Sequence, residues 1–286
     1  MTMTEKLKNA DAAVLYIAGQ SNAHAHAQAL PEEEKLRFGL KHVFTLDHRI
    51  DRSLDNKSLI WRQFTSEYNN LGEHQDDTAT LGYYTALEWE KRIEQGEKLP
   101  DLYIVQISIG AQGVANGMWN MEMEKKLVND DVTPVPLYHL AMHIYSLVYE
   151  DLKARYKNPA AIGWHWIGSE SDAVKEYADI PTMPAYLERF FDDMFSAIGF
   201  ECPAYFYKLA HYKNDSAYKK GIDLINDIFN KYLAKHKSGK MVDCTLSPYW
   251  NFDLVGSGIY NEEDKIHYLS PVQKWFADQL FVNLED

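Results

Sequence analysis

Residues 12–22 read Ala-Ala-Val-Leu-Tyr-Ile-Ala-Gly-Gln-Ser-Asn, an apolar run that gives way at once to a glycine and three polar residues. Such a run is typical of a strand that is buried on both faces, as the strands of parallel sheets are. A glycine directly after it indicates a tight turn at the carboxyl end of the strand, where open α/β sheets bind ligands. The stretch therefore predicts a parallel sheet and, at its edge, a functional site.

Outward from this run, apolar segments of strand length alternate with segments of helical period. The predicted strands are residues 12–18, 43–46, 102–107, 160–167, 203–209 and 241–244. The predicted helices are residues 79–95, 134–156, 184–198, 218–237 and 271–282. This alternation predicts a three-layer α/β/α sandwich, in which helices cover both faces of a mainly parallel sheet. We expect one domain over residues 1–286, with long loops at 29–42, 47–77 and 108–133.

The composition argues against several classes of partner. The 286 residues carry 42 acidic and 29 basic side chains, a formal net charge of −13, whereas nucleic acid and anionic membranes select basic surfaces. The two cysteines, Cys202 and Cys244, lack the number and spacing of a disulfide scaffold or a zinc site. We therefore expect reduced thiols in a protein core, and neither nucleic acid nor a membrane as partner.

The start of the chain superficially resembles a signal peptide, because Lys6 and Lys8 precede the apolar run at 12–18. Cleavage after Ala18 would separate this run from the motif directly behind it, so we expect no signal peptide. No run approaches the ~20 apolar residues needed to span a bilayer. These features favour a cytoplasmic protein, although a phage-associated component would share them.

Ser21 lies where a strand-to-helix turn would expose its hydroxyl and place its backbone N–H near a helix start. Both features suit a nucleophile that forms part of an oxyanion hole, and the alternative is a serine that only caps the next helix. Near the other end of the chain, Asp264 and His267 are spaced to meet around one turn. A serine nucleophile needs such an imidazole as base and such a carboxylate to orient it, whereas alone the two would form a surface ion pair. The combination favours catalysis.

Two further segments follow predicted strands. The glycines of the first run from Gly110 through Gly113 to Gly117, which is not the dinucleotide-binding spacing. Glycines do allow a backbone amide to approach an oxyanion closely. In the second segment, Glu170 and Asp172 are placed to orient a histidine or to contact substrate, unless they are acids at a helix N-terminus favoured by its dipole.

Together these four segments resemble those of SGNH-type hydrolases, specifically the branch of sialate O-acetylesterases and acetylxylan-esterase-like carbohydrate esterases. That branch opens with Gly-Gln-Ser-Asn, matched in full by residues 19–22, and closes with Asp-x-x-His, matched by residues 264–267. Its Gly-Gly-Thr segment with a following Trp corresponds to residues 112–114 and Trp119. The end of its Gln-Gly-Glu-Ser-Asp-Ala segment corresponds to residues 170–173. The resemblance implies a flavodoxin-like, mainly parallel sheet of five strands.

The resemblance also implies a serine esterase that hydrolyses O-acetyl esters of carbohydrates without a metal or other cofactor. Ser21 would attack the acyl carbon, His267 would act as general base and then as acid, and Asp264 would hold the imidazole. The predicted oxyanion donors are the backbone N–H groups of Ser21 and Gly113 together with Asn116, and the predicted substrate contacts are Gln20, Asn22 and Trp119. An acetylated carbohydrate is the expected partner, and no oligomeric state follows from the sequence. His24 and His26, close behind Ser21, fit hydrogen-bonded or solvated histidines better than metal ligands.

The chain departs from this pattern at residues 168–169, where Gly-Ser replaces the Gln-Gly that helps to form the family's oxyanion hole. One oxyanion donor is worth on the order of 3–4 kcal/mol, so we expect weak acetyl-esterase activity, with Asn116 or Ser169 lending a donor. Glu170 is the alternative acid of the triad. The rival functions are a catalytically degenerate glycan-binding or structural member of the same fold, and a lipase or thioesterase.

Overall fold

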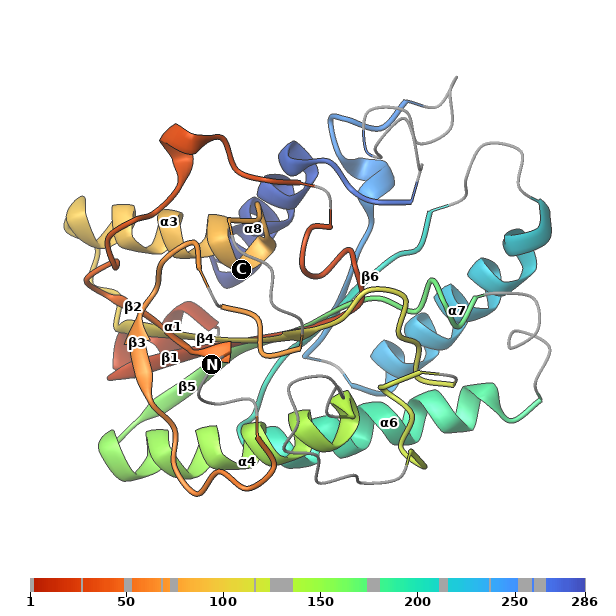
Figure 1. The fold of residues 1–286 in the computed structure, drawn as a ribbon, viewed down its shortest axis with the longest axis horizontal. Coiled ribbons are helices and arrows are strands. Elements are labelled where there is room, and N and C mark those ends of the chain that lie inside the picture. The colour runs from red at the N-terminus through yellow and green to blue at the C-terminus, as the bar shows by residue number, and fades with distance from the viewer. Residues whose placement is uncertain are drawn as a thin grey trace.

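The computed structural model describes residues 3–26, 28–48, 53–67, 69–72, 77–115, 117–123, 136–173, 181–210, 216–236, 238–251, 259 and 266–285. At its centre lies a seven-stranded sheet with the order β3-β2-β4-β1-β5-β6-β7 (Figure 1). The strands are β1 (Ala12–Gly19), β2 (Val43–Leu46), β3 (Trp61–Gln63), β4 (Asp101–Ser108), β5 (Pro159–Ile167), β6 (Ala204–Tyr207) and β7 (Lys240–Val242). Neighbouring strands are parallel, except that β3 runs antiparallel to β2.

The sheet confirms the predicted fold class but corrects the predicted number of strands. Strands β4, β1, β5, β6 and β7 follow the flavodoxin-like order. Beyond β4 the sheet continues through β2 and β3, so it has seven strands where five were expected. Each predicted strand is present, with its ends shifted by at most two residues. The sequence did not predict β3, because its three residues, Trp-Arg-Gln, are too few to carry a readable periodicity.

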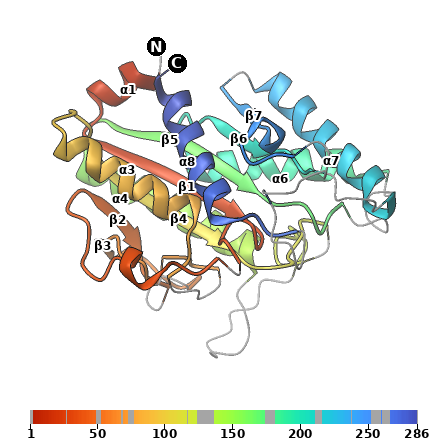
Figure 2. The ribbon, with the colours of Figure 1, turned by 90° about the horizontal axis from the view of Figure 1, so that it is seen from above.

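Helices cover both faces of the sheet (Figure 1, Figure 2). One face is covered by α1 (Met3–Asn9), α3 (Leu81–Glu94) and α8 (Ser270–Glu285), and the other by α4 (Leu137–Arg155), α6 (Met183–Ile198) and α7 (Ser216–Lys235). Successive residues of β1 point to opposite faces: Val14 and Tyr16 belong to the core beneath α4 and α6, while Leu15 and Ile17 pack with α3 and α8. The expected three-layer sandwich is thus confirmed.

The apolar run near the start of the chain is the central strand of this sheet. Every residue of β1 is buried, and Leu7 of α1 packs in the core that also contains α8. The sequence did not predict α1, whose seven residues are too few for a clear helical pattern. Among the residues that the structure describes, no helix combines the length and the apolar character needed to cross a membrane.

The position of β1 in the sheet marks where a ligand site is expected. It pairs with β4 on one side and with β5 on the other, so the strand order reverses at β1. In open α/β sheets, ligands bind at such a switch point, outside the carboxyl ends of the strands. The segments that follow β1, β4 and β5 are those in which the sequence predicted functional residues.

Candidate active site

The turn after β1 begins at a position that only glycine can occupy. Gly19 has φ of 145°, and a Cβ built on it would lie 2.0 Å from the carbonyl oxygen of Ile167 at the end of β5. This close approach brings the ends of β1 and β5 together and leads directly into the turn that carries Ser21. Ser21 is partly exposed, whereas its neighbours Gln20 and Asn22 are buried. The structure therefore presents the Ser21 residue at the switch point of the sheet.

Asn22 fastens the loop that carries His267 to this turn. Its side-chain Nδ2 donates to the carbonyl oxygen of Ile266 at 3.0 Å, and its Oδ1 accepts from the backbone N–H of Tyr268 at 2.9 Å. The backbone on both sides of His267 is thus bonded to the residue next to Ser21. The loop of His267 is therefore bonded to the turn of Ser21, although the two segments lie near opposite ends of the chain.

Glu170, the alternative acid, joins the same group of residues. Its Oε1 accepts a hydrogen bond of 2.8 Å from Asn22 Nδ2. The residue is partly exposed, but its Oε2 is buried and has no hydrogen-bond partner among the described residues. Burial raises the pKa of the Glu170 carboxyl above its usual range, although the Asn22 hydrogen bond and the nearby His267 ring act in the opposite direction. Asp264 lies outside the described residues.

Two further histidines surround His267. The His26 ring is exposed and lies 4.6 Å from the His267 ring, centroid to centroid, while the His26 backbone N–H donates to the carbonyl oxygen of Ser21 at 3.0 Å. His24 is buried, and burial lowers its pKa to about 3. His24 therefore stays neutral at ordinary pH. Within the described part of the chain, no group of three or more His, Cys, Asp or Glu side chains is arranged to hold a metal ion.

Asp172 joins the segment after β5 to the glycine loop after β4. Its carboxylate accepts hydrogen bonds from the backbone N–H groups of Val114, at 3.1 Å, and Ala115, at 2.8 Å. A Cβ on Gly113 would lie 2.5 Å from Asp172 Oδ1, so the loop passes too close for any side chain there. Asp172 is therefore a structural residue that holds Gly113 beside the site. Asn116, the additional predicted oxyanion donor, lies outside the described residues.

The three predicted substrate contacts are buried and already bonded within the protein. Both amide atoms of Gln20 pair with Ser171: Nε2 donates to its hydroxyl at 2.9 Å, and Oε1 accepts from its backbone N–H at 3.2 Å. Trp119 is fully buried, and its indole N–H donates to the carbonyl oxygen of Gly19 at 3.0 Å. Asn22 makes the bonds described above. Because their polar groups are used internally, we assign Gln20, Asn22 and Trp119 to the support of the turn instead of to substrate contact.

Ser169 does not offer the free hydroxyl that the sequence suggested. The residue is fully buried with φ of 82°, a left-handed conformation that is uncommon for serine. Its hydroxyl accepts from the Trp166 indole N–H at 3.1 Å and hydrogen-bonds to the Asp172 carboxylate. A hydroxyl engaged in this way holds the turn after β5 and is not available to an oxyanion.

One supporting residue has no signal in the sequence. Asn70 lies in the long loop between β3 and α3, and its side chain pairs with the backbone of Ser108 at the end of β4. Its Nδ2 donates to the Ser108 carbonyl oxygen, and its Oδ1 accepts from the Ser108 N–H, both at 2.9 Å. The side chain thus imitates a neighbouring strand. It fixes the end of β4, from which the glycine loop begins.

Comparison with known proteins supports the fold. No protein-family model and no curated protein matches the sequence. The structure of a protein from Arabidopsis thaliana matches with a TM-score of 0.62 and 13% identity, over 97% of this chain and 99% of the other. NanS matches with a TM-score of 0.60 and 15% identity, over 96% and 98%. At such identities the likeness shows the fold alone.

A family two carbohydrate esterase from Clostridium thermocellum, solved in complex with cellohexaose, matches less well. Its TM-score is 0.46 at 10% identity, over 96% of this chain and 64% of that chain. This similarity is too weak to carry an argument about function, which must come from the residues of the site.

Proposed function

We propose that this chain is a serine esterase in which Ser21 is the nucleophile and His267 is its base. The observation that carries the proposal is the bonding of Asn22 to the backbone on both sides of His267, since it ties the imidazole to the turn that presents Ser21. The partial exposure of Ser21 at the switch point gives a substrate access to the hydroxyl.

The proposed reaction proceeds through an acyl-enzyme. Ser21 Oγ attacks the acyl carbon while His267 takes its proton, and the carbonyl oxygen becomes an oxyanion that the backbone N–H groups of Ser21 and Gly113 stabilise. The intermediate then expels the alkoxide of the leaving group, which receives the proton from His267. His267 then deprotonates a water molecule that attacks the acyl carbon. The bond from this carbon to Ser21 Oγ breaks, Ser21 takes the proton back from His267, and the carboxylic acid is released.

Two carboxylates are assigned different parts in this reaction. Asp264 is the proposed orienting acid, because it stands three residues before His267 in the sequence. Glu170 is supported by its contacts: it shares the Asn22 amide with the backbone beside His267, and its charge interacts with the His267 ring. We assign to Glu170 the electrostatic stabilisation of the imidazolium that forms when His267 takes the proton.

The proposed substrate class is an O-acetylated carbohydrate. The resemblance of residues 19–22 and 264–267 to carbohydrate esterases supports this class. A lipase or thioesterase would use the same catalytic groups, so the two are separated by acyl-chain length. An O-acetylesterase should hydrolyse aryl acetate faster than aryl octanoate, and the reverse preference would favour the lipase or thioesterase.

The deciding test compares Ser21→Ala with the wild-type protein on aryl acetate and on O-acetylated sugars. Ser146→Ala is the matched control, since Ser146 is an exposed serine on α4, outside the site. We expect Ser21→Ala to lower kcat by a factor on the order of 10⁴ or more, because a triad without its nucleophile loses most of its catalysis. Ser146→Ala should equal the wild type. A wild type that is as inert as Ser21→Ala on every acetate would refute the proposal.

A second candidate is a glycan-binding protein that does not turn over its ligand. The Ser169 hydroxyl favours this candidate, because it is engaged inside the protein and cannot replace the donor lost at residues 168–169. Saturable binding of acetylated sugars to the wild type and to Ser21→Ala alike, without hydrolysis by either, would establish it.

A further inference from the structure

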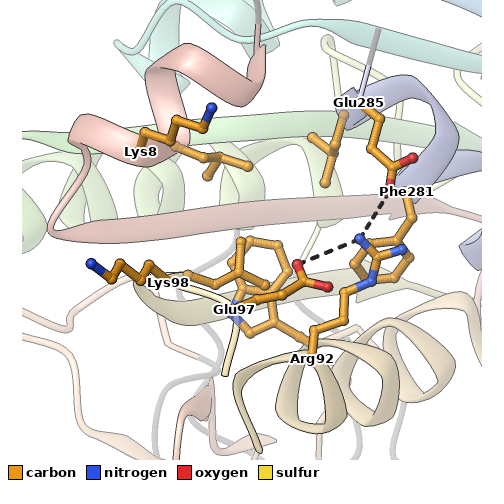
Figure 3. Close-up of a pocket in the computed structure, with 10 residues that line it drawn as sticks. Lys8, Arg92, Glu97, Lys98, Phe281 and Glu285 are labelled. Carbon is orange, nitrogen blue, oxygen red and sulfur yellow. Dashed lines mark hydrogen bonds and ion pairs between the residues drawn. The ribbon is translucent and has the colours of Figure 1, made fainter. Parts of the chain in front are cut away.

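A pocket of about 520 Å³ lies at the opposite edge of the sheet from the candidate active site. It is bounded by α1, by the ends of α3 and α8, and by residues 97–99, which lead into the start of β4 (Figure 3). Because Ser21 follows the carboxyl end of β1 and the pocket lies where β1 and β4 begin, the eight residues of β1 separate the two by about 25 Å. This volume lies within the range of about 300–1,000 Å³ that is usual for ligand sites.

The walls of this pocket are largely apolar. They are formed by Leu7, Trp89, Leu99, Phe281 and Leu284. One wall is stiffened by Arg92, whose guanidinium lies 4.5 Å from the centre of the Phe281 ring. Walls of this kind favour an aliphatic or aromatic group as the buried part of a ligand.

Charge is unevenly distributed around the pocket. At one end Arg92 is neutralised, since it bonds to Glu88 at 3.2 Å and Glu285 at 3.0 Å and lies 3.8 Å from Glu97. Away from Arg92, on opposite walls of the pocket, stand Lys8 on α1 and Lys98 in the segment before β4, two exposed lysines that form no ion pair with any residue in the described ranges (Figure 3). In a chain with a net charge of −13, two such cations beside one apolar pocket define the part of it that an anionic group would occupy.

We propose that this pocket binds a small monocarboxylate with an unbranched apolar tail. The tail would lie against Trp89, Phe281 and Leu284, and the carboxylate would lie between the walls that carry Lys8 and Lys98. The proposal is independent of the esterase function, because none of the lining residues belongs to the turn of Ser21 or to the loop of His267.

The test is calorimetric titration of the full chain with hexanoate, octanoate and decanoate, and with octanol as the uncharged probe. We expect one saturable site and an affinity that rises about fourfold for each added methylene until the pocket is filled. Octanol should bind about tenfold more weakly than octanoate, because it lacks the charge.

Two variants locate the bound acid. Lys8→Glu/Lys98→Glu should weaken octanoate binding about tenfold or more and leave octanol binding unchanged. The control Lys153→Glu/Lys219→Glu makes the same change in net charge at two exposed lysines on α4 and α7, which cover the other face of the sheet, and should have no effect. Leu99→Trp, which fills the pocket, should abolish binding of both probes.

Absence of saturable octanoate binding to the wild type would overturn the proposal. Binding that survives both Leu99→Trp and the charge reversal would also overturn it, since the acid would then occupy another site such as the catalytic edge.

Discussion

Asn22 and Asn226 have the same structural role at two places along the carboxyl edge of the sheet. Asn226, on α7, donates from Nδ2 to the carbonyl oxygen of Leu209 at 2.8 Å and accepts from its N–H at 2.9 Å, which fixes the chain just after β6. Asn22 fixes the loop of His267 by the same device. In each case one amide group satisfies a donor and an acceptor that the loop backbone would otherwise leave unpaired.

The two sites differ in what the asparagine holds. Around Asn226 the polar groups are matched, as in the 2.7 Å ion pair between Lys208 and Asp243. Around Asn22, the carboxyl group of Glu170 has a buried oxygen without a described hydrogen-bond partner, and the exposed His26 ring packs on His267. Buried polar groups usually have hydrogen-bond partners. A buried polar atom without one therefore indicates that the residue serves a function besides stabilising the fold.

The largest predicted effect distinguishes the two candidate acids of the triad, Asp264 and Glu170. Asp264→Asn should lower kcat by a factor on the order of 10⁴, because an asparagine favours the imidazole tautomer that cannot accept the serine proton. Glu170→Gln should lower kcat less, about tenfold to a hundredfold, because it removes a charge near His267 and retains an acceptor for Asn22. Steady-state kinetics on aryl acetate measure both. The reverse ranking would assign the orienting role to Glu170.

The comparison of the two asparagines predicts the next largest effect. Asn22→Ala and Asn226→Ala should each lower the free energy of unfolding by about 2–4 kcal/mol, since each leaves a backbone donor and acceptor unpaired. Only Asn22→Ala should also lower kcat, about a hundredfold, because a misplaced His267 cannot reach the serine proton. Urea unfolding and kinetics below the unfolding transition measure the two quantities. Equal kcat values in both variants would show that Asn22 is no more than a structural residue.

Features that depend on neighbouring residues could be predicted from the sequence, whereas contacts between segments distant in the sequence could not. Every strand except β3 was predictable because a buried strand is a local apolar run, and the turn of Ser21 was predictable because Gly19 follows such a run directly. The bond of Asn70 to Ser108, and that of Asp172 to the glycine loop, join segments that are distant in the sequence. No local pattern marks such pairs. For the same reason the sequence assigned the buried Trp119 to substrate when it supports Gly19.

A smaller effect is expected where His26 packs against His267. The ring of His26 lies 4.6 Å from that of His267, and an aromatic pair of this kind is worth about 0.5–1.5 kcal/mol. His26→Ala should therefore lower kcat about threefold to tenfold without changing KM, whereas His26→Phe, which keeps a ring at this position, should restore most of the rate. If KM rises and kcat does not change, His26 contacts the substrate instead of positioning His267.

The smallest predicted effect is on stability, and it follows from the raised pKa of Glu170. When the folded-state pKa of a carboxyl lies above its unfolded value of about 4.3, the folded state binds more protons, so stability falls as the pH rises through the interval between the two values. Glu170→Gln removes this loss and keeps the acceptor for Asn22, so the variant should gain stability over the wild type as the pH rises above about 4.3. The change should be no steeper than ~1.4 kcal/mol per pH unit, the limit for one proton. Unfolding free energies of the variant and the wild type, measured by denaturant titration from pH 4 to pH 8, test this. A difference for Glu170→Gln that is constant with pH would contradict the unmatched buried carboxyl on which the comparison of the two asparagines rests.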